Sequence, residues 1–133
     1  MRFADVQVGD NLPPLTSSQI NRTTLALFAG ASGDHNPIHI DIDFARAAGM
    51  PDVFVHGMLG MAYLGRLLTN WVPQSAIREF STRFTAITQL QEEITCMGTI
   101  VEKLEGNLVR LDLQAANAAG EVKLAGQAVV ALE

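Results

Sequence analysis

The segment from His56 to Trp71, HGMLGMAYLGRLLTNW, constrains the fold more than any other part of the chain. Its apolar residues fall on almost every side of a helix: Met58, Leu59, Met61, Tyr63, Leu64, Leu67 and Leu68. A helix that is apolar nearly all round has to be covered by other structure. The segment is shorter than the about 20 residues that a membrane span needs, and it contains Arg66. We therefore predict a buried helix and no membrane span.

The residues that follow this helix are typical of β-strands. Residues 108–115 alternate apolar and polar side chains, which predicts a strand with one buried face. Further strands are expected at residues 80–88, 94–101 and 122–132, with hairpin turns at Glu105–Asn107 and Ala119–Gly120. A buried helix followed by an antiparallel meander predicts an α+β architecture in which the sheet wraps the helix. The length favours one domain over residues 1–133.

The first half of the chain is predicted to be irregular and helical. Proline pairs, glycines and capping residues divide it into short pieces. We expect a strand or lead-in over residues 6–12, a short strand around Ser18–Ile20, a helix from the Asn21 cap to Gly33, and a short helix over residues 44–48 capped by Asp41 or Asp43.

Charge argues against nucleic acid as a partner. The net charge is −5, and the nine basic residues are scattered from Arg2 to Lys123 without a basic patch. Only 17% of the residues are charged, whereas 48% are hydrophobic. A surface this poor in charge favours association with copies of the same chain, so we expect a homodimer or a higher homo-oligomer.

The cysteine content bears on the compartment. Cys96 is the one cysteine, which rules out an intrachain disulfide and a cysteine metal cluster. Residues 1–10 lack the apolar segment of a signal peptide. We therefore expect a cytoplasmic protein.

The stretch SGDHNPIHID, which begins at Ser32, gathers many proton-handling groups. Pro37 fixes its own φ and drives Asn36 into an extended conformation, so we expect a bend with an extended continuation. A carboxylate and an imidazole that meet at such a bend, here Asp34 and His39, form an acid–base pair. The same spacing is compatible with a polar loop that contains Asx turns at Asp34 and Asn36.

His56 and Gly57 stand where the central helix is expected to begin. Backbone N–H groups at the start of a helix are free to receive negative charge. A residue without a Cβ lets a carbonyl group approach them, which is the geometry of an oxyanion hole. The alternative is a tight turn in which Gly57 serves packing alone.

Other chemistries have little support in the sequence. Histidines and aspartates provide metal-ligand types, but their spacing matches no metal-binding motif, so no metal is expected. No GxSxG motif and no phosphate-binding loop occur, and Cys96 stands in an apolar strand as a packed small residue. Arg78 and Arg83 flank the first expected strand, where either can meet a phosphate or face solvent.

Taken together, SGDHNPIHID and VFVHGMLGMAYLG resemble the MaoC-like hydratases and dehydratases, a family that includes (R)-specific enoyl-CoA hydratases. The similarity extends to VQVGDNLP, RFTAIT and GQAVVAL and covers nearly the whole chain. The resemblance implies a hot-dog fold, in which a curved antiparallel sheet wraps a long central helix and which usually forms dimers.

The resemblance also implies roles for residues of the first motif. Asp34 and His39 would be the catalytic pair, and Asn36 would help to fix this pair and a water molecule. His35 is not expected to be catalytic, because an adjacent side chain in an extended segment points the opposite way. Asp41 is expected to serve as a cap or a surface residue.

By the same resemblance, the second motif would bind the substrate. The backbone N–H of Gly57 would form the oxyanion hole for a thioester oxygen, and His56 and Met58 would contact the substrate. The implied reaction is the reversible hydration of a trans-2-enoyl-CoA to a (3R)-hydroxyacyl-CoA, with no metal and no cofactor.

Two alternatives stay open. The chain also resembles dehydratase subunits that act on (3R)-hydroxyacyl groups bound to acyl carrier protein (ACP), so the partner is an acyl-CoA or an acyl-ACP thioester. The other alternative is a hot-dog thioesterase or a non-catalytic module that binds acyl thioesters. The intact set of Asp34, Asn36 and His39 argues against an inactive module.

Overall fold

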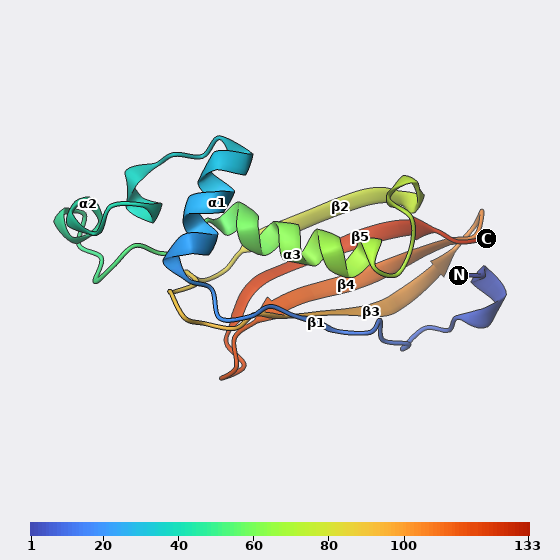
Figure 1. Cartoon of the computed structure of the whole chain (residues 1–133). Coiled ribbons are helices and arrows are strands. Elements are labelled where there is room, and N and C mark those ends of the chain that lie inside the picture. Colours follow the sequence, from blue (N-terminus) through green and yellow to red (C-terminus); the bar gives the residue numbers. More distant parts are fainter.

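A long helix, α3 (Gly57–Thr69), lies across one face of a five-stranded antiparallel sheet (Figure 1). The computed structural model describes residues 1–133. The strands are β1 (Leu15–Thr16), β2 (Ile77–Phe84), β3 (Thr95–Leu104), β4 (Leu108–Ala116) and β5 (Val122–Ala131). The predicted α+β architecture is confirmed.

The strand order departs from a simple meander. β3, β4 and β5 follow one another through the two predicted turns, where Asn107 and Gly120 adopt positive φ angles of 59° and 84°. β2 does not lie beside β3 but pairs with β5, at the opposite edge from β1. β2 also ends at Phe84, so Ile87 and Thr88, which were expected in this strand, belong to the connection that leads to β3.

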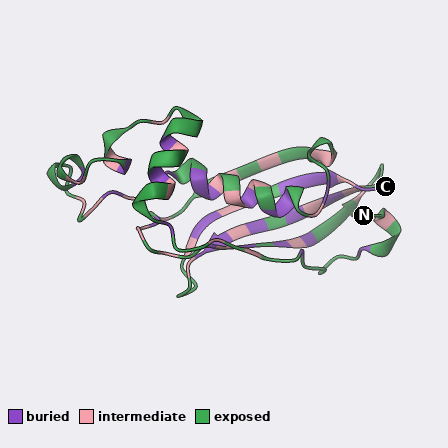
Figure 2. Ribbon diagram, in the orientation of Figure 1, coloured by how far each residue is buried: buried purple, intermediate pink, exposed green.

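The core lies between α3 and the sheet. Five residues of α3 are buried: Leu59, Gly60, Leu64, Leu67 and Leu68. The expectation of a helix covered on every side is wrong for the single chain, because the sheet covers one side only. On the outer side Met58 is 54% exposed and Ala62 is exposed, and Figure 2 shows this side largely in green and pink. The helix therefore presents an open, partly apolar face.

Residues 6–12, for which a strand or a lead-in was expected, form a lead-in along the edge of β3 and no regular strand. This lead-in forms one isolated bridge with β3, between Asn11 and Thr99, and the N–H of Gly9 also donates to the carbonyl oxygen of Ile100. The second expected strand, around Ser18–Ile20, is displaced to β1. Prolines 13 and 14 lie between bridge and strand, and they have no N–H group to continue the ladder of hydrogen bonds.

Short helices gather at one end of the sheet, away from the two chain termini (Figure 1). They comprise the α-helices α1 (Arg22–Ser32) and α2 (Ile42–Ala47) and the 3-10 helix η2 (Pro37–His39); two more 3-10 helices, η1 (Phe3–Asp5) and η3 (Gln74–Ala76), lie elsewhere. None of the helices combines the length and the apolar character that crossing a bilayer requires.

The caps of α1 and α2 follow the sequence expectation. The side chain of Asn21 accepts a hydrogen bond from the Thr24 N–H at 2.9 Å, and α1 ends at Gly33, whose φ is 77°. The Asp41 carboxylate accepts from the Asp43 N–H at 2.9 Å, so α2 starts at Ile42, two residues before the predicted start at Phe44. These caps fix both ends of the connection that carries SGDHNPIHID.

Candidate active site

A tight turn after α1 brings Asp34 and His39 together. The Asn36 side chain accepts a hydrogen bond from the Ile38 N–H at 3.1 Å and so caps η2, in which Pro37 is the first residue. The extended continuation that was expected after Pro37 is therefore wrong. Proline is well tolerated in the first turn of a helix, where its missing N–H would have had no partner.

The orientation of the His39 ring is set by a backbone carbonyl. His39 Nδ1 lies 2.7 Å from the carbonyl oxygen of Phe54, which can only accept, so Nδ1 carries the proton. Nε2 of the neutral ring is then free to accept a proton, and it lies 3.9 Å from Asp34 Oδ2. This distance is too long for a direct hydrogen bond and short enough for one bridging water molecule. His39 is buried, whereas the Asp34 side chain is 44% exposed.

His56 contacts both Asp34 and His39. Its ring is 1% exposed and stacks on His39 with ring centroids 4.0 Å apart, while Phe28 contacts it edge-on at 4.9 Å. His56 Nε2 donates to the backbone carbonyl of Asp34 at 3.2 Å. Burial, together with the nearby His39, lowers the pKa of His56 below its ordinary value. A neutral His56 therefore holds the His39 ring and the Asp34 backbone in place.

Asn36 and His35 both lie at the surface. The backbone N–H of Asn36 donates to Asp34 Oδ1 at 3.2 Å, so Asn36 orients the carboxylate through its main chain while its side chain caps η2. Asx turns at Asp34 and Asn36, the alternative weighed for this stretch, are thus present together with the Asp34–His39 pair. The side-chain oxygen of Asn36 is engaged in this cap, and the expected part of Asn36 in fixing the pair and a water molecule stays a prediction.

Gly57 occupies the first position of α3, and no carbonyl oxygen of the chain accepts from its N–H. A Cβ here would lie 3.0 Å from the Phe84 ring. Gly57 borders a cavity of about 310 Å³ between the start of α3 and the segment after β2, lined by Phe54, Val55, His56, Gly57, Gly60, Phe84, Thr85, Ala86, Ile87, Thr88 and Leu124.

A second cavity, of about 480 Å³, borders the outer face of α3 and contains Asp34 and Met58. Its remaining lining is mainly apolar and includes Met61 and Phe80. The first turn of α3 therefore separates two openings, one beside the Gly57 N–H and one beside the Asp34 carboxylate. The substrate contacts expected of His56 and Met58 stay predictions.

The cluster of Asp34, His39 and His56 brings potential metal ligands within 4.8 Å of one another. The two imidazole planes, however, are inclined by only 24° and lie face to face, so their lone pairs run in nearly parallel planes and do not converge on one ion. His39 Nδ1 and His56 Nε2 are also engaged by backbone carbonyls. The arrangement suits proton transfer better than metal binding.

Sequence reasoning missed two parts of this site. The Phe54 carbonyl that orients His39 has no signature, because every residue offers a carbonyl. The cavity wall at residues 85–88 had been assigned in part to a strand. The remaining candidates do not line either cavity: Arg78 and Arg83 are exposed, and Cys96 is fully buried in β3, where burial raises the pKa of its thiol to about 11.

A long helix that lies against a curved antiparallel sheet is the architecture of the hot-dog fold, and Asp34 and His39 lie together beside the start of that helix. The family model described as "MaoC like domain" matches residues 5–119, and the chain therefore belongs to the MaoC-like family, as its motifs predicted. The R-hydratase PhaJ1 from Pseudomonas aeruginosa, solved without ligand, superimposes with a TM-score of 0.88 and 30% sequence identity, over 99% of this chain and 86% of that chain. This likeness confirms the predicted hot-dog fold.

Curated relatives point to the same group of proteins. An (R)-specific enoyl-CoA hydratase from Rhodospirillum rubrum is 26% identical over 130 residues, which are 96% of this chain and 89% of the relative. The fatty acid synthase beta subunit TOXC of Cochliobolus carbonum is 31% identical over 107 residues, or 77% of this chain. The chain spans only 5% of the length of that subunit.

Proposed function

We propose that the protein catalyses the (R)-specific, reversible hydration of trans-2-enoyl-CoA to (3R)-hydroxyacyl-CoA, as one catalytic domain. The observation that carries this proposal is the position of His39 Nε2, 3.9 Å from Asp34 Oδ2 in a chain of the MaoC-like family. The (3R) configuration rests on the similarity to the R. rubrum hydratase and to PhaJ1.

The proposed reaction starts from a water molecule held by Asp34 and His39. One of the two groups accepts a proton from the water as its oxygen bonds to C3 of the enoyl thioester. A proton is delivered to C2, so that the water supplies both added groups and the pair regains its starting protonation state. General acid–base catalysis of this kind contributes about 100-fold or more per group.

Negative charge accumulates on the thioester oxygen during this addition. The free N–H of Gly57 and the N-terminus of α3 would stabilise that charge. Oxyanion donors in comparable sites contribute about 3–4 kcal/mol. The thioester would then enter beside Gly57 while the water is held on the Asp34 side of the same helix turn.

The test is the loss of enoyl absorbance when the purified protein is mixed with crotonyl-CoA, followed by determination of the product configuration. We expect an (R)-3-hydroxy product, and a fall in kcat/KM of at least about 100-fold in both Asp34→Asn and His39→Ala. His35→Ala is the matched control, since His35 is an exposed neighbour of the pair and should keep full activity. Full activity in both site variants would remove the catalytic assignment, and release of free CoA would favour a thioesterase.

The carrier of the acyl group distinguishes the second candidate function. Similarity to a mitochondrial 3-hydroxyacyl-[acyl-carrier-protein] dehydratase of Arabidopsis thaliana, 33% identical over 67 residues, favours a (3R)-hydroxyacyl-ACP dehydratase, which uses the same chemistry in reverse. Comparing crotonyl-CoA with crotonyl-ACP under identical conditions separates the two. Turnover of the ACP substrate alone would assign the protein to the dehydratases.

We further propose that the protein is a cytoplasmic homodimer. β2 is an edge strand paired on one side only, and Phe80 of β2 borders the same cavity as Met58 and Ala62 of the open face of α3. Pairing of β2 with its copy would cover that face. Sedimentation should give twice the mass of one chain, and Phe80→Glu should shift the protein toward monomer. A monomeric wild-type protein would contradict the dimer.

The single, buried, free cysteine accords with a reducing compartment.

A further inference from the structure

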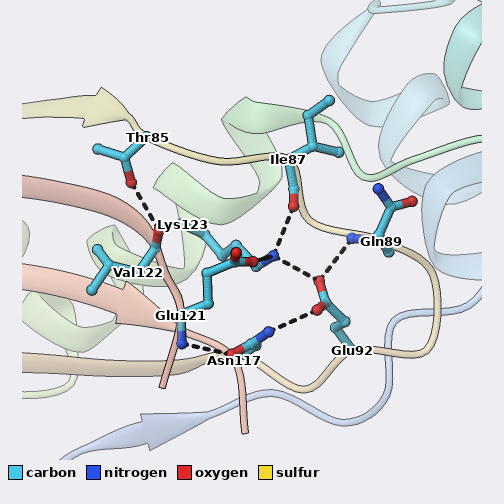
Figure 3. Close-up of polar contacts among 8 residues, drawn as sticks. All are labelled: Thr85, Ile87, Gln89, Glu92, Asn117, Glu121, Val122 and Lys123. Carbon is cyan, nitrogen blue, oxygen red and sulfur yellow. Dashed lines mark hydrogen bonds and ion pairs between the residues drawn. The ribbon is translucent and has the colours of Figure 1, made fainter. Parts of the chain in front are cut away.

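Lys123, in β5, is the one lysine or arginine that is buried in the structure, with 2% of its surface exposed. Its ammonium group donates to the carbonyl oxygen of Ile87 at 2.8 Å and forms ion pairs with Glu92, at 3.3 Å, and with Glu121 (Figure 3). A buried ammonium group is unfavourable unless it is paired and hydrogen-bonded, and here all three of its donors have partners.

Glu92 connects this ammonium group to two other parts of the chain (Figure 3). One carboxylate oxygen accepts from the Gln89 N–H at 2.8 Å, and the other accepts from the Asn117 side chain at 2.8 Å. Burial alone would raise the pKa of Glu92, but the hydrogen bonds from Asn117, Gln89 and Lys123 outweigh it and lower the pKa. Burial alone would lower the pKa of Lys123, but its hydrogen bonds to Glu121 and Glu92 raise it. Both groups therefore stay charged near neutral pH.

The segment held by this pair, residues 85–89, is also fastened to the backbone of β5. The N–H groups of Thr85 and Ala86 both donate to the Lys123 carbonyl oxygen, at 2.9 and 3.4 Å. The Thr85 hydroxyl donates to the carbonyl oxygen of Val122 at 2.9 Å. The side chain and the backbone of Lys123 thus hold the same segment at several points.

The other side of segment 85–89 faces the candidate active site. Residues 85–88 form the wall of the 310 Å³ cavity across from Gly57, while Lys123 and Glu92 do not line that cavity. The Thr88 carbonyl oxygen accepts from the Val55 N–H at 2.9 Å, which places segment 85–89 beside the residue that directly precedes His56 and Gly57. The ion pair does not touch the cavity itself. It contacts segment 85–89 directly, and Leu124, the neighbour of Lys123 in β5, also lines the cavity.

We propose that Lys123 and Glu92 are positioning residues: they fix segment 85–89 as a wall of the cavity and so set which acyl groups fit beside the Gly57 N–H. This inference rests on the proposed function, because the acyl group in question is that of an enoyl thioester. The bound carbonyl of Ile87 and the bound N–H of Gln89 are the two points through which the pair acts.

Three variants test the proposal. Lys123→Met removes the ammonium group and keeps most of the aliphatic stem, and Glu92→Gln keeps acceptor and shape but removes the charge. Glu121→Gln is the matched control, because Glu121 pairs with the same ammonium group but is exposed and has no hydrogen bond to segment 85–89. Hydration kinetics on enoyl-CoA substrates of increasing chain length, and amide hydrogen exchange of residues 85–89, are measured for each.

We expect Lys123→Met and Glu92→Gln to raise KM about tenfold, to alter the ranking of chain lengths and to leave kcat within about threefold, since the acid–base pair is untouched. Exchange at residues 85–89 should rise in both variants, and Glu121→Gln should match the wild type in every measurement. The proposal would be overturned if segment 85–89 exchanged faster in the variants while their KM values and chain-length ranking stayed those of the wild type. It would also be overturned if Glu121→Gln had the same effect as Lys123→Met and Glu92→Gln. If Lys123→Met does not fold, Glu92→Gln decides. A wild-type protein that hydrates no enoyl-CoA would refute the proposed function, and the exchange data would still show whether Lys123 holds the segment.

Discussion

Replacing Gly57 by alanine separates stability from catalysis at the start of α3. A Cβ at this position would lie 3.0 Å from both Cδ1 and Cε1 of the Phe84 ring. Phe84 is 54% exposed, so its ring can move by a few tenths of an ångström toward solvent at little cost. Alanine also gains up to about 1 kcal/mol of helix propensity over glycine. We therefore expect the melting temperature of Gly57→Ala to stay within about 4 °C of the wild type.

The expected effect on catalysis is much larger. The new methyl group would stand beside the N–H that is proposed to receive the thioester oxygen, in a cavity of only about 310 Å³. Deleting an oxyanion donor lowers kcat by about 100- to 1,000-fold. The methyl group obstructs the donor without deleting it, so we expect the lower limit, a loss of about 100-fold in kcat/KM, which corresponds to about 2.7 kcal/mol.

The assay is the hydration of crotonyl-CoA, with thermal unfolding measured on the same preparations. Gly30→Ala is the control for helix propensity, because Gly30 lies in α1 and a Cβ there would meet no atom within 4 Å. This control should be slightly more stable than the wild type and equally active. If Gly57→Ala kept kcat/KM within about threefold, the argument that Gly57 admits a close approach to its N–H would be refuted.

Two further predictions concern stability. Gly60→Ala should lower the melting temperature, because its Cβ would lie 2.7 Å from Cδ1 of Leu124, which is 2% exposed and cannot move into solvent; overpacking of this kind costs about 1–3 kcal/mol, and an unchanged melting temperature would contradict it. The free energy of unfolding should fall as the pH decreases from 7 to 5. The pKa of His56 is lower in the folded protein than in the unfolded chain, where it has its ordinary value of 6.5, so the unfolded chain binds the proton more readily. Urea unfolding at both pH values should show a smaller fall in His56→Gln, and equal falls would argue against His56 as the source.

The parts of the fold that were predictable depend on local signals. Asn21, Asp41 and Gly33 act on the backbone within a few residues of themselves, so the helix ends could be placed from the sequence. The pairing of β2 with β5 joins residues that are about 45 positions apart, and no local signal specifies it. The exposure of one side of α3 was not predicted for a related reason. The apolar residues of a helix indicate that its faces are buried in the assembled protein, but they do not indicate whether the same chain or another chain buries them.

Within the candidate site, side chains with distinctive chemistry were found and backbone partners were not. Asp34 and His39 stand out by residue type, whereas the Phe54 carbonyl that fixes the His39 ring is invisible to any motif. Lys123 had the appearance of one more scattered basic residue, because its burial depends on three partners from separate parts of the chain, Ile87, Glu92 and Glu121.

The turn at Pro37 shows how a correct pair can follow from an incorrect local geometry. An extended chain advances about 3.3 Å per residue, so Asp34 and His39, five positions apart, would be separated by about 16 Å if the whole stretch were extended. A 3-10 helix advances only about 2.0 Å per residue and turns every three residues, which reverses the chain direction after Asn36 and lets Oδ2 and Nε2 approach to 3.9 Å. The Asx turns at Asp34 and Asn36 therefore help to bring Asp34 and His39 together, because Asn36 caps the 3-10 helix with its side chain and orients Asp34 with its N–H.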